Sequence, residues 1–452
     1  MGLRTAFRTI QRFFFDPPET VLKRPTHGQM KYLSHSTQAV FSPLASLMLL
    51  GLVFRLPAGE NWPQFRGPLG AGCANGPAPP IRWSETENIR WKTAIHGKGW
   101  SSAVIWDEQI WLTTATPDGH ALFAVCIERG SGKILHDLKV FDIAKPDFCH
   151  PFNSYASPTP AIEAGRVYIH FGSAGTACLD SRQGKILWIR QDLPCDHYRG
   201  PGSSPVLFNN LLIVHFDGVD QQYIVALDKH TGKTVWRRNR DIDYQTDIAD
   251  LKKAYATPTI IEVGGKAQII SPAAAATFAY DPQTGQELWR VRHGGMNVAA
   301  PPQFGQGKLF LCTGDGGLGL LAVRPDGHGD VTATHIDWTY HKGVPTRCSP
   351  LLLDGRLYMV NERGLASCLE AATGRPVWQV RLDGAFSAAP IYAGGSIYCC
   401  SQEGKSYVIA QGQVGKILAV NPLEEGCMAT PAVADGALFL RTKTALYRIQ
   451  QK

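Results

Sequence analysis

A recurring eleven-residue turn is the feature that most restricts how this chain can fold. Segment 226–236 reads ALDKHTGKTVW and segment 279–289 reads AYDPQTGQELW, with Asp, Gly and Trp at matching places. Further copies end in Trp188 and Trp378, and weaker ones end in His136 and Leu418. The Asp can accept bonds from turn N–H groups, and the Gly supplies a positive φ. The Trp then begins a return strand and offers a flat surface that can fill the space between sheets.

Each turn belongs to a longer repeat that opens with a small residue, usually followed by proline or alanine. Successive openings are 40 to 55 residues apart, at Ser102-Ala103, Ser157-Pro158, Ser204-Pro205, Thr257-Pro258, Ala300-Pro301, Ser349-Pro350, Ala389-Pro390 and Thr430-Pro431. Four short strands per repeat at this period are typical of propeller blades, and small openings suit inner strands that crowd an axis. The sequence therefore predicts an all-β, eight-bladed β-propeller.

The two ends of the repeat region complement each other. The last repeat, 430–449, has room for three strands, and the segment Asn88–Lys92 (NIRWK) reads as a Trp-bearing outer strand. Pairing this N-terminal strand with the C-terminal ones closes the ring and removes a free sheet edge. We therefore predict a propeller over 88–452 preceded by a lead-in over 60–87. A β-sandwich or two smaller domains are the alternatives, but nothing in the sequence marks a linker.

Residues 1–59 are predicted to be a targeting segment. Ala39–Phe54 is an apolar run of 16 residues, short for a transmembrane helix and suited to a signal-peptide core. Translation from Met30 would give this run a compact basic start, whereas a true start at Met1 favours a signal anchor. Both routes export 60–452 to the periplasm or cell envelope. The alternative is a buried apolar helix of the fold.

Charge and cysteine spacing exclude several functions. Of 45 basic and 38 acidic residues, 7 basic and 2 acidic lie in 1–59, which leaves the remainder at +2. A nearly neutral body offers no electrostatic surface for nucleic acid. The 11 cysteines include no Cys-x-x-Cys pair, which argues against a zinc site, and no Cys-x-x-Cys-His for attachment of haem c.

The turn pattern Ala-x-Asp-x-x-Thr-Gly-x-x-x-Trp resembles the tryptophan-docking motif of the PQQ-like, or quinoprotein-like, propellers, over about residues 61–450. One branch of that superfamily comprises the dehydrogenases of alcohols and sugars that bind pyrroloquinoline quinone (PQQ) and usually Ca²⁺. The other is non-enzymatic and includes BamB-like exported propellers. The stretch Asn61–Gly67 (NWPQFRG) is similar to the lead-in of exported members. No lipobox Cys follows the apolar run, so a lipid anchor of the BamB type is not expected.

Residues just before the opening strands should surround one mouth of the central channel. The binding-surface candidates are Trp100, Tyr155, Arg199, Tyr255, Asn297, Arg347 and Phe386, with Ser203, Met428, His150, Asn153, His197 and Lys253 nearby. Aromatic rings with Arg and Lys can hold an anionic planar ligand, and the same residue types favour protein-binding hot spots. A third possibility is that they only plug the channel.

Residues that could carry quinoprotein chemistry have plainer interpretations. The pair Cys399-Cys400 resembles the vicinal disulfide of the dehydrogenases, but it lies in a strand pattern, where successive residues point to opposite faces. Two separate strand thiols are therefore predicted. Asp217 and Asp315 are interpreted as turn caps, and His230 and His293 as solvated turn residues. No catalytic residue, metal or cofactor is predicted.

These observations favour an exported, non-enzymatic propeller that acts as a protein-interaction or scaffold module of the cell envelope. The expected partner is a protein or another polymer at the channel mouth, with no nucleic acid. Membrane contact is expected only through an uncleaved N-terminal segment, and the protein is expected to be a monomer. The alternative is a PQQ-dependent alcohol or sugar dehydrogenase, in which case PQQ and Ca²⁺ are the cofactors.

Overall fold

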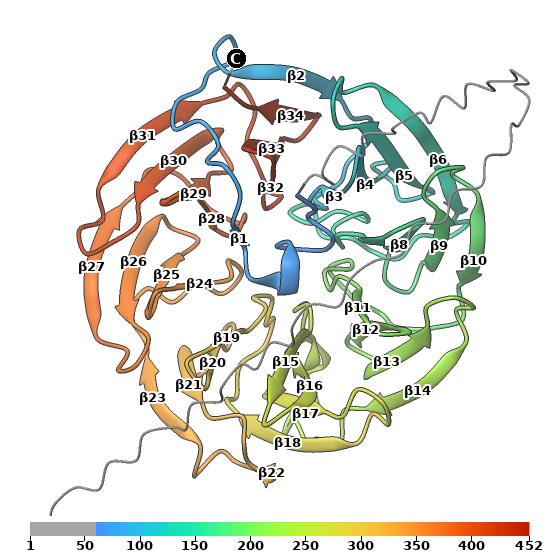
Figure 1. Ribbon diagram of the computed structural model, residues 1–452. Helices are drawn as coiled ribbons and strands as arrows, with labels where there is room; N and C mark the ends of the chain where they lie inside the picture. Colours follow the sequence, from blue (N-terminus) through green and yellow to red (C-terminus); the bar gives the residue numbers. More distant parts are fainter. Residues whose placement is uncertain (1–59, 452) are drawn as a thin grey trace, which may run out of the picture. The chain divides into compact units, whose positions relative to one another are not determined.

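The computed structural model describes residues 60–451, which form eight β-sheets arranged as a ring (Figure 1). Each sheet is one blade of antiparallel strands, and the innermost strand of each blade faces the central axis. The predicted eight-bladed β-propeller is confirmed. The targeting segment and the proposed start at Met30 lie outside the described residues.

The first four blades follow one another along the chain. Blade 1 contains β3 (Val104–Trp106), β4 (Gln109–Ala115), β5 (Ala121–Glu128) and β6 (Ile134–Asp142). Blade 2 contains β7 (Ala161–Glu163), β8 (Arg166–His170), β9 (Thr176–Asp180) and β10 (Ile186–Arg190). Blade 3 contains β11 (Val206–Phe208), β12 (Leu211–Asp217), β13 (Gln222–Asp228) and β14 (Thr234–Asn239). Blade 4 contains β15 (Thr259–Val263), β16 (Lys266–Pro272), β17 (Ala276–Tyr280) and β18 (Glu287–Arg292), with β22 (Gly329–Asp330) parallel beside β18.

The other four blades complete the ring. Blade 5 contains β19 (Gln303–Gly305), β20 (Lys308–Cys312), β21 (Leu320–Val323) and β23 (Ile336–Tyr340). Blade 6 contains β24 (Leu351–Leu353), β25 (Arg356–Val360), β26 (Leu365–Glu370) and β27 (Pro376–Arg381). Blade 7 contains β28 (Ile391–Ala393), β29 (Ser396–Cys400), β30 (Lys405–Ala410) and β31 (Ile417–Pro422), with β1 (Cys73–Ala74) parallel beside β28. Blade 8 contains β32 (Ala432–Ala434), β33 (Ala437–Arg441), β34 (Ala445–Ile449) and β2 (Ile89–Ala94).

Helical structure is minor in the described part of the chain. It consists of two short 3₁₀ turns, η1 (Pro68–Gly70) and η2 (Ala249–Lys252). Within residues 60–451, no helix has the length and apolar character needed to cross a bilayer.

The ring closes as the sequence predicts. Strand β2 pairs antiparallel with β34, with Ile89 opposite Ile449 and Ala94 opposite Ala445. Arg129 links blade 1 to blade 8, because its guanidinium lies 2.6 Å from Glu108 of blade 1 and 2.8 Å from Asp435 of blade 8. The N-terminal strand β2 is therefore the outer strand of the last blade and completes it.

The repeated turn explains how neighbouring blades adhere. The Trp188 Nε1 of blade 2 donates to the Lys229 carbonyl of blade 3 at 3.0 Å. Gly232 lies under the indole so closely that a Cβ there would come within 2.7 Å of Trp188. Within the turn, Asp228 Oδ1 accepts a bond from the Thr231 N–H at 2.8 Å. The same Trp-on-Gly contact recurs at Trp91–Gly132, Trp236–Gly285, Trp338–Gly374 and Trp378–Gly415.

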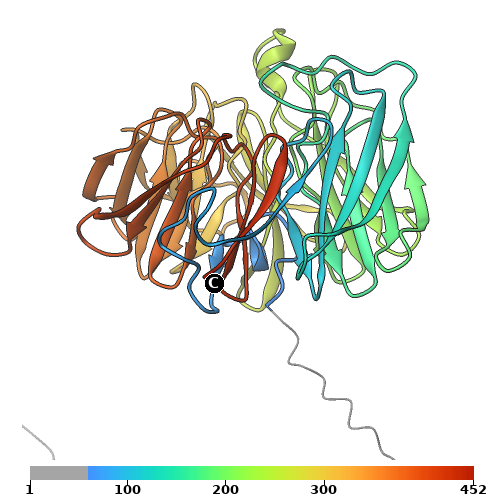
Figure 2. The same cartoon turned by 90° about the horizontal axis from the view of Figure 1, so that it is seen from above.

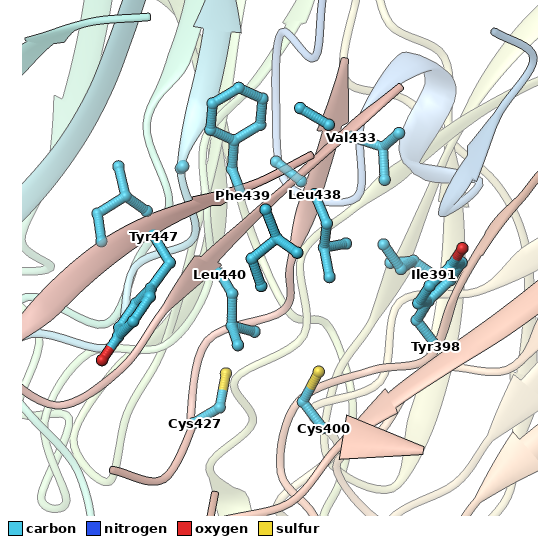
Figure 3. Close-up of a cluster of buried hydrophobic side chains, with 14 of the residues drawn as sticks. Ile391, Tyr398, Cys400, Cys427, Val433, Leu438, Phe439, Leu440 and Tyr447 are labelled. Carbon is cyan, nitrogen blue, oxygen red and sulfur yellow. The ribbon is translucent and has the colours of Figure 1, made fainter. Parts of the chain in front are cut away.

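The hydrophobic core consists of clusters between blades. The cluster in Figure 3 joins blades 7 and 8, with residues such as Ile391, Tyr398, Leu438 and Phe439 fully or almost fully buried. Because every blade contributes both faces of its middle strands to such clusters, those strands are buried on both sides, as β29 and β33 are.

Candidate functional site

A cavity of about 410 Å³ occupies one end of the central channel. Loops that precede the inner strands supply its wall, so each blade presents its opening residues to the same space. The residues that shape its chemistry are Trp100, Phe152, Tyr255, Arg199, Arg347, Asn297, Asp315, His150 and Met428. The sequence placed the binding surface at this mouth, and the structure shows a hollow there.

Hydrogen bonds between neighbouring blades line part of the inner wall of the cavity. The Ser102 N–H donates to Thr159 Oγ1, the Thr159 N–H to Ser204 Oγ and the Ser204 N–H to Thr257 Oγ1, each at 2.9 Å. Across the channel, the Ala389 N–H donates to Thr430 Oγ1 at 3.0 Å. The small residue that opens each repeat is thus often a hydroxyl that ties one blade to the previous one. The Ser102 hydroxyl itself is buried and has no partner among the described residues.

The lead-in forms the floor of the cavity. The N–H and C=O of Trp62 pair with Ile105 of β3 at 2.9 and 2.8 Å. Phe65 lines both the mouth cavity and an apolar groove of about 660 Å³ on its other side. Figure 1 shows η1 at the centre of the ring, where it follows these residues. The mouth cavity is therefore blind, because the NWPQFRG segment plugs the channel beneath it.

Arg66 fastens this plug. Its buried guanidinium donates to the carbonyls of Ser349, Pro350 and Pro390, at 3.4, 2.8 and 3.1 Å. Burial lowers the pKa of Arg66 to about 10. The guanidinium donates hydrogen bonds to five backbone carbonyls rather than to a carboxylate. Backbone oxygens from blades 6 and 7 thus hold the lead-in in the ring.

Two arginines give the cavity its positive character. Arg347 is exposed, and its guanidinium stacks 5.0 Å from the ring centre of Phe152. No carboxylate in residues 60–451 lies within ion-pair distance of it. Glu362 instead accepts the Arg347 backbone N–H at 2.7 Å and so holds the loop. The second arginine, Arg199, lies 3.6 Å from Asp250.

Polar atoms without partners also face this region. Asn297 donates through Nδ2 to Asp315 at 3.0 Å, while its Oδ1 is buried without a partner in the described chain. Trp100 donates through Nε1 to the Phe152 carbonyl at 3.1 Å, which fixes the indole at the rim. Tyr255 is half-buried, and burial raises the pKa of its hydroxyl, so it remains a neutral donor.

An apolar wall rises beside the mouth. Phe148 and Ile248 are each 60% exposed, and the Phe148 ring lies 6.1 Å from that of Tyr198. The segment that contains η2 stands above one face of the disc (Figure 2). The buried ion pair between Asp217 and Arg240, at 2.9 and 2.8 Å, anchors the start of that segment.

Five of the seven binding-surface candidates line the cavity: Trp100, Arg199, Tyr255, Asn297 and Arg347. Tyr155 lies in an adjacent depression of about 230 Å³, where its hydroxyl donates to the Asp147 carbonyl at 2.8 Å. Phe386 was wrongly placed on the surface. It is fully buried and packs among core residues of blades 6 and 7, with its ring 6.2 Å from Tyr407.

Other interpretations of single residues need correction. Asp217 is not a turn cap, because both its oxygens bind Arg240 in the interior. His293 is not solvated: it is buried, and burial lowers its pKa to about 4. Lys253 is also fully buried, where it pairs with Asp250 instead of facing a ligand. These side chains support the mouth loops rather than line the cavity.

The sequence missed Phe65 and Phe152. Phe65 belongs to a lead-in interpreted only as a family signature, and nothing in its spacing indicates that it enters the channel. Phe152 lies in the loop that also contains His150 and Asn153, so its aromatic character was an available signal.

The described residues do not fit a calcium site of the quinoprotein kind. Ca²⁺ takes six to eight oxygen ligands, but Asp315 is the one carboxylate in the cavity wall. Within residues 60–451, no three His, Cys, Asp or Glu residues are grouped to hold a metal. The two arginines could pair with carboxylates of an anionic ligand, but the oxygen set for a cation is not assembled.

The family profile described as "Outer membrane protein assembly factor BamB" matches residues 83–262 and 337–418, more than half of the chain. The chain belongs to this BamB-type family of PQQ-like propellers. A curated relative, the BamB of Yersinia pestis, is 24% identical over 56% of this chain. The match covers 61% of the length of that relative, which is less than two thirds.

Solved structures show the same fold. The BamB of Moraxella catarrhalis superposes with a TM-score of 0.56 at 15% identity, covering 80% of this chain and 98% of that one. A quinohaemoprotein alcohol dehydrogenase from Comamonas testosteroni gives 0.64 at 12% identity, covering 87% and 81%. Both branches of the superfamily therefore share the architecture of this BamB-type propeller.

Proposed function

We propose that this BamB-type propeller is exported and binds a partner protein at its channel mouth without catalysing a reaction. The observation that carries the proposal is the blind cavity, whose rim presents exposed Phe152 and the cation of Arg347, which has no carboxylate partner within residues 60–451. Aromatic residues and Arg are enriched in protein-binding hot spots; the rings bury a large area at small entropic cost, and Arg adds directed, charged hydrogen bonds. Phe148 and Tyr198 extend this apolar area beyond the cavity.

The chemistry of the rim favours an acidic partner segment. Arg347 and Lys98 have no carboxylate within ion-pair distance among the described residues, and Asp315 is the single acidic residue of the cavity wall. A guanidinium stacked on an aromatic ring keeps its N–H groups free for bidentate binding of a carboxylate. An extended segment with an Asp or Glu could pair with these two cations.

The location follows from the family and from the N-terminal sequence. We take residues 1–59 as the targeting segment, 60–87 as the lead-in and 88–452 as the propeller, acting as a monomer in the periplasm or cell envelope. The apolar run Ala39–Phe54 and the family name, which refers to outer-membrane assembly, support this proposal.

The test is a pull-down from solubilised envelope with the full chain as bait. The double variant Trp100→Ala/Arg347→Glu is expected to retain at least tenfold less of the partner than the wild type. Arg375→Glu is the matched control, because its side chain is 72% exposed and lies outside the cavity wall. Equal retention of the partner by the double variant and the wild type would show that the partner does not bind at the channel mouth.

A PQQ-dependent dehydrogenase is the second candidate, because Arg199 and Arg347 in one cavity could pair with the carboxylates of PQQ. Calorimetric titration of the full chain with PQQ, with and without Ca²⁺, separates the two functions. We expect no saturable binding. Saturable one-to-one binding that requires Ca²⁺ would favour the dehydrogenase and call for an alcohol screen with an artificial electron acceptor.

A further inference from the structure

Two buried cysteines from adjacent blades lie next to each other near the ring closure. Cys400 is the last residue of β29 in blade 7, and Cys427 lies in the loop before β32 of blade 8. They are 1% and 2% exposed and belong to the same core cluster. Figure 3 shows the two side chains side by side, with both sulfur atoms pointing into the same space beside Leu440.

The neighbouring Cys399 has a different environment. Strand residues alternate in direction, so Cys399 packs with Cys348 and Tyr358 between blades 6 and 7, and Cys400 packs between blades 7 and 8. Cys399 therefore provides a matched thiol, one residue away on the same strand, that cannot reach Cys427 without turning the strand over.

The surroundings favour reaction of the pair. The Cys427 Sγ lies 2.8 Å from the Ala429 carbonyl and 3.2 Å from that of Arg441, and the Ser406 hydroxyl donates to Cys400 Sγ at 3.4 Å. The hydrogen bond between the two thiols lowers the pKa of Cys400 and raises that of Cys427, so the two side chains are in contact in the folded chain. The thiolate is the species that attacks a disulfide.

We propose that Cys400 and Cys427 form a disulfide bond that staples blade 7 to blade 8. One thiolate attacks a disulfide oxidant, R–S–S–R, to give a mixed disulfide and one RSH. The second thiolate then displaces the other R–S⁻, which is protonated to RSH. Two protons and two electrons thus pass from the cysteines to the oxidant, which is reduced to two thiols. Because both side chains are buried, we expect the reaction to take place before folding is complete.

The position of the bond has a structural reason. Blade 7 carries Leu418 where most repeats have Trp, and blade 8 takes its outer strand β2 from the N-terminal side, so no turn connects β34 to β2 to receive a Trp. Among the described residues, the junction of blades 7 and 8 therefore lacks the Trp-on-Gly contact that joins blades 2 and 3, as do the junctions of blades 1 and 2 and of blades 4 and 5. A covalent bond there compensates for the missing contact. In an exported protein an oxidising compartment supplies the oxidant, so the reaction in the cell rests on the proposed location, whereas the pairing itself does not.

The experiment is a tryptic map of the folded full chain without reduction. The protein is isolated from the envelope and, in a parallel sample, from the cytosol followed by refolding with oxidised glutathione. Cleavage after Arg381, Lys405, Lys416 and Arg441 releases peptides 382–405 and 417–441. We expect the two peptides to be linked one to one in both samples and separate after reduction. Since peptide 382–405 holds both Cys399 and Cys400, the link should persist in Cys399→Ser and disappear in Cys400→Ser.

A linked pair of this kind closes a loop of about 28 residues, and its reduction should lower the thermal midpoint by about 4 °C. Free thiols at both positions in the refolded, oxidised sample overturn the proposal, as does a link that depends on Cys399. A link in the refolded sample with free thiols in cells would instead leave the pairing intact and contradict the proposed export. If Cys400→Ser does not fold, persistence of the link in Cys399→Ser still decides the matter.

Discussion

Replacing Asp217 by Asn should strongly destabilise the propeller. Asp217 is 2% exposed, and both its carboxylate oxygens bind the fully buried guanidinium of Arg240. Burial works against the charge of Arg240, but the carboxylate outweighs it and raises the pKa of that guanidinium. The amide of Asn is neutral, so the substitution leaves a buried cation without its counter-charge. Loss of one partner of a buried pair costs about 3–5 kcal/mol.

The thermal midpoint converts this free energy into an observable. For about 390 residues the entropy of unfolding is about 0.8 kcal/mol per kelvin, so the midpoint should fall by about 4–6 °C. Circular dichroism of the full chain during heating and in urea measures the change. The matched control is Asp383→Asn, because Asp383 is 77% exposed and pairs with the half-exposed Lys405. Exposed pairs contribute about 0–1 kcal/mol.

The double variant Asp217→Leu/Arg240→Met tests the cause. Removing both charges should restore most of the lost stability, because the stranded cation is then absent. A loss in Asp217→Asn no larger than in Asp383→Asn would refute the reasoning. The reasoning would also be refuted if the double variant had a lower free energy of unfolding than Asp217→Asn, by as much as a second, independent substitution would cost.

Three further predictions concern stability. His170, His197 and His293 are buried, which lowers their pKa values to about 3, 4 and 4. As the pH falls, the unfolded chain therefore binds protons before the folded chain does, and the free energy of unfolding decreases from pH 6.5 toward pH 4. By pH 5.5 the loss is about 1.4 kcal/mol per histidine, so urea midpoints at pH 7.5 and 5.5 should differ less in His293→Asn than in the wild type. Gly232→Ala should cost at least 1 kcal/mol more than Gly165→Ala, about the cost of overpacking, because both have positive φ but only Gly232 lies against an indole; equal losses would contradict the docking contact. Trp62→Ala should cost about 3–5 kcal/mol, whereas Leu69→Ala, at an 80% exposed position, should change urea unfolding little.

The ring was predictable because its determinants are local and repeated. The Asp, Gly and Trp of segment 226–236 dictate a turn by their own conformational preferences, and the period then dictates blades. Even the closure by β2 followed from a missing strand at one end and a spare Trp-bearing strand at the other. Local and repeated patterns of this kind can be recognised in the sequence without knowledge of tertiary contacts.

The candidate site was only partly predictable, because its remaining features depend on contacts between distant segments. Phe386 precedes an opening strand just as Trp100 does, yet it packs inward between blades. Asp217 and Arg240 meet in the interior although 23 residues separate them in sequence. The plug formed by Phe65 and Arg66 involves carbonyls nearly 300 residues away. Spacing along the chain contains no information about such pairs.

The central claim is that the mouth, and not the opposite face, contacts a partner protein. Site-specific photo-crosslinking in living cells tests it most directly, with benzoylphenylalanine introduced in place of Phe152 or in place of Leu69, which lines the groove on the other side of the plug. We expect benzoylphenylalanine at position 152 to give a discrete protein adduct, which Arg347→Glu abolishes. The same residue at position 69 should give no adduct. An adduct from position 69 alone, or one from position 152 that is indifferent to Arg347→Glu, would contradict it.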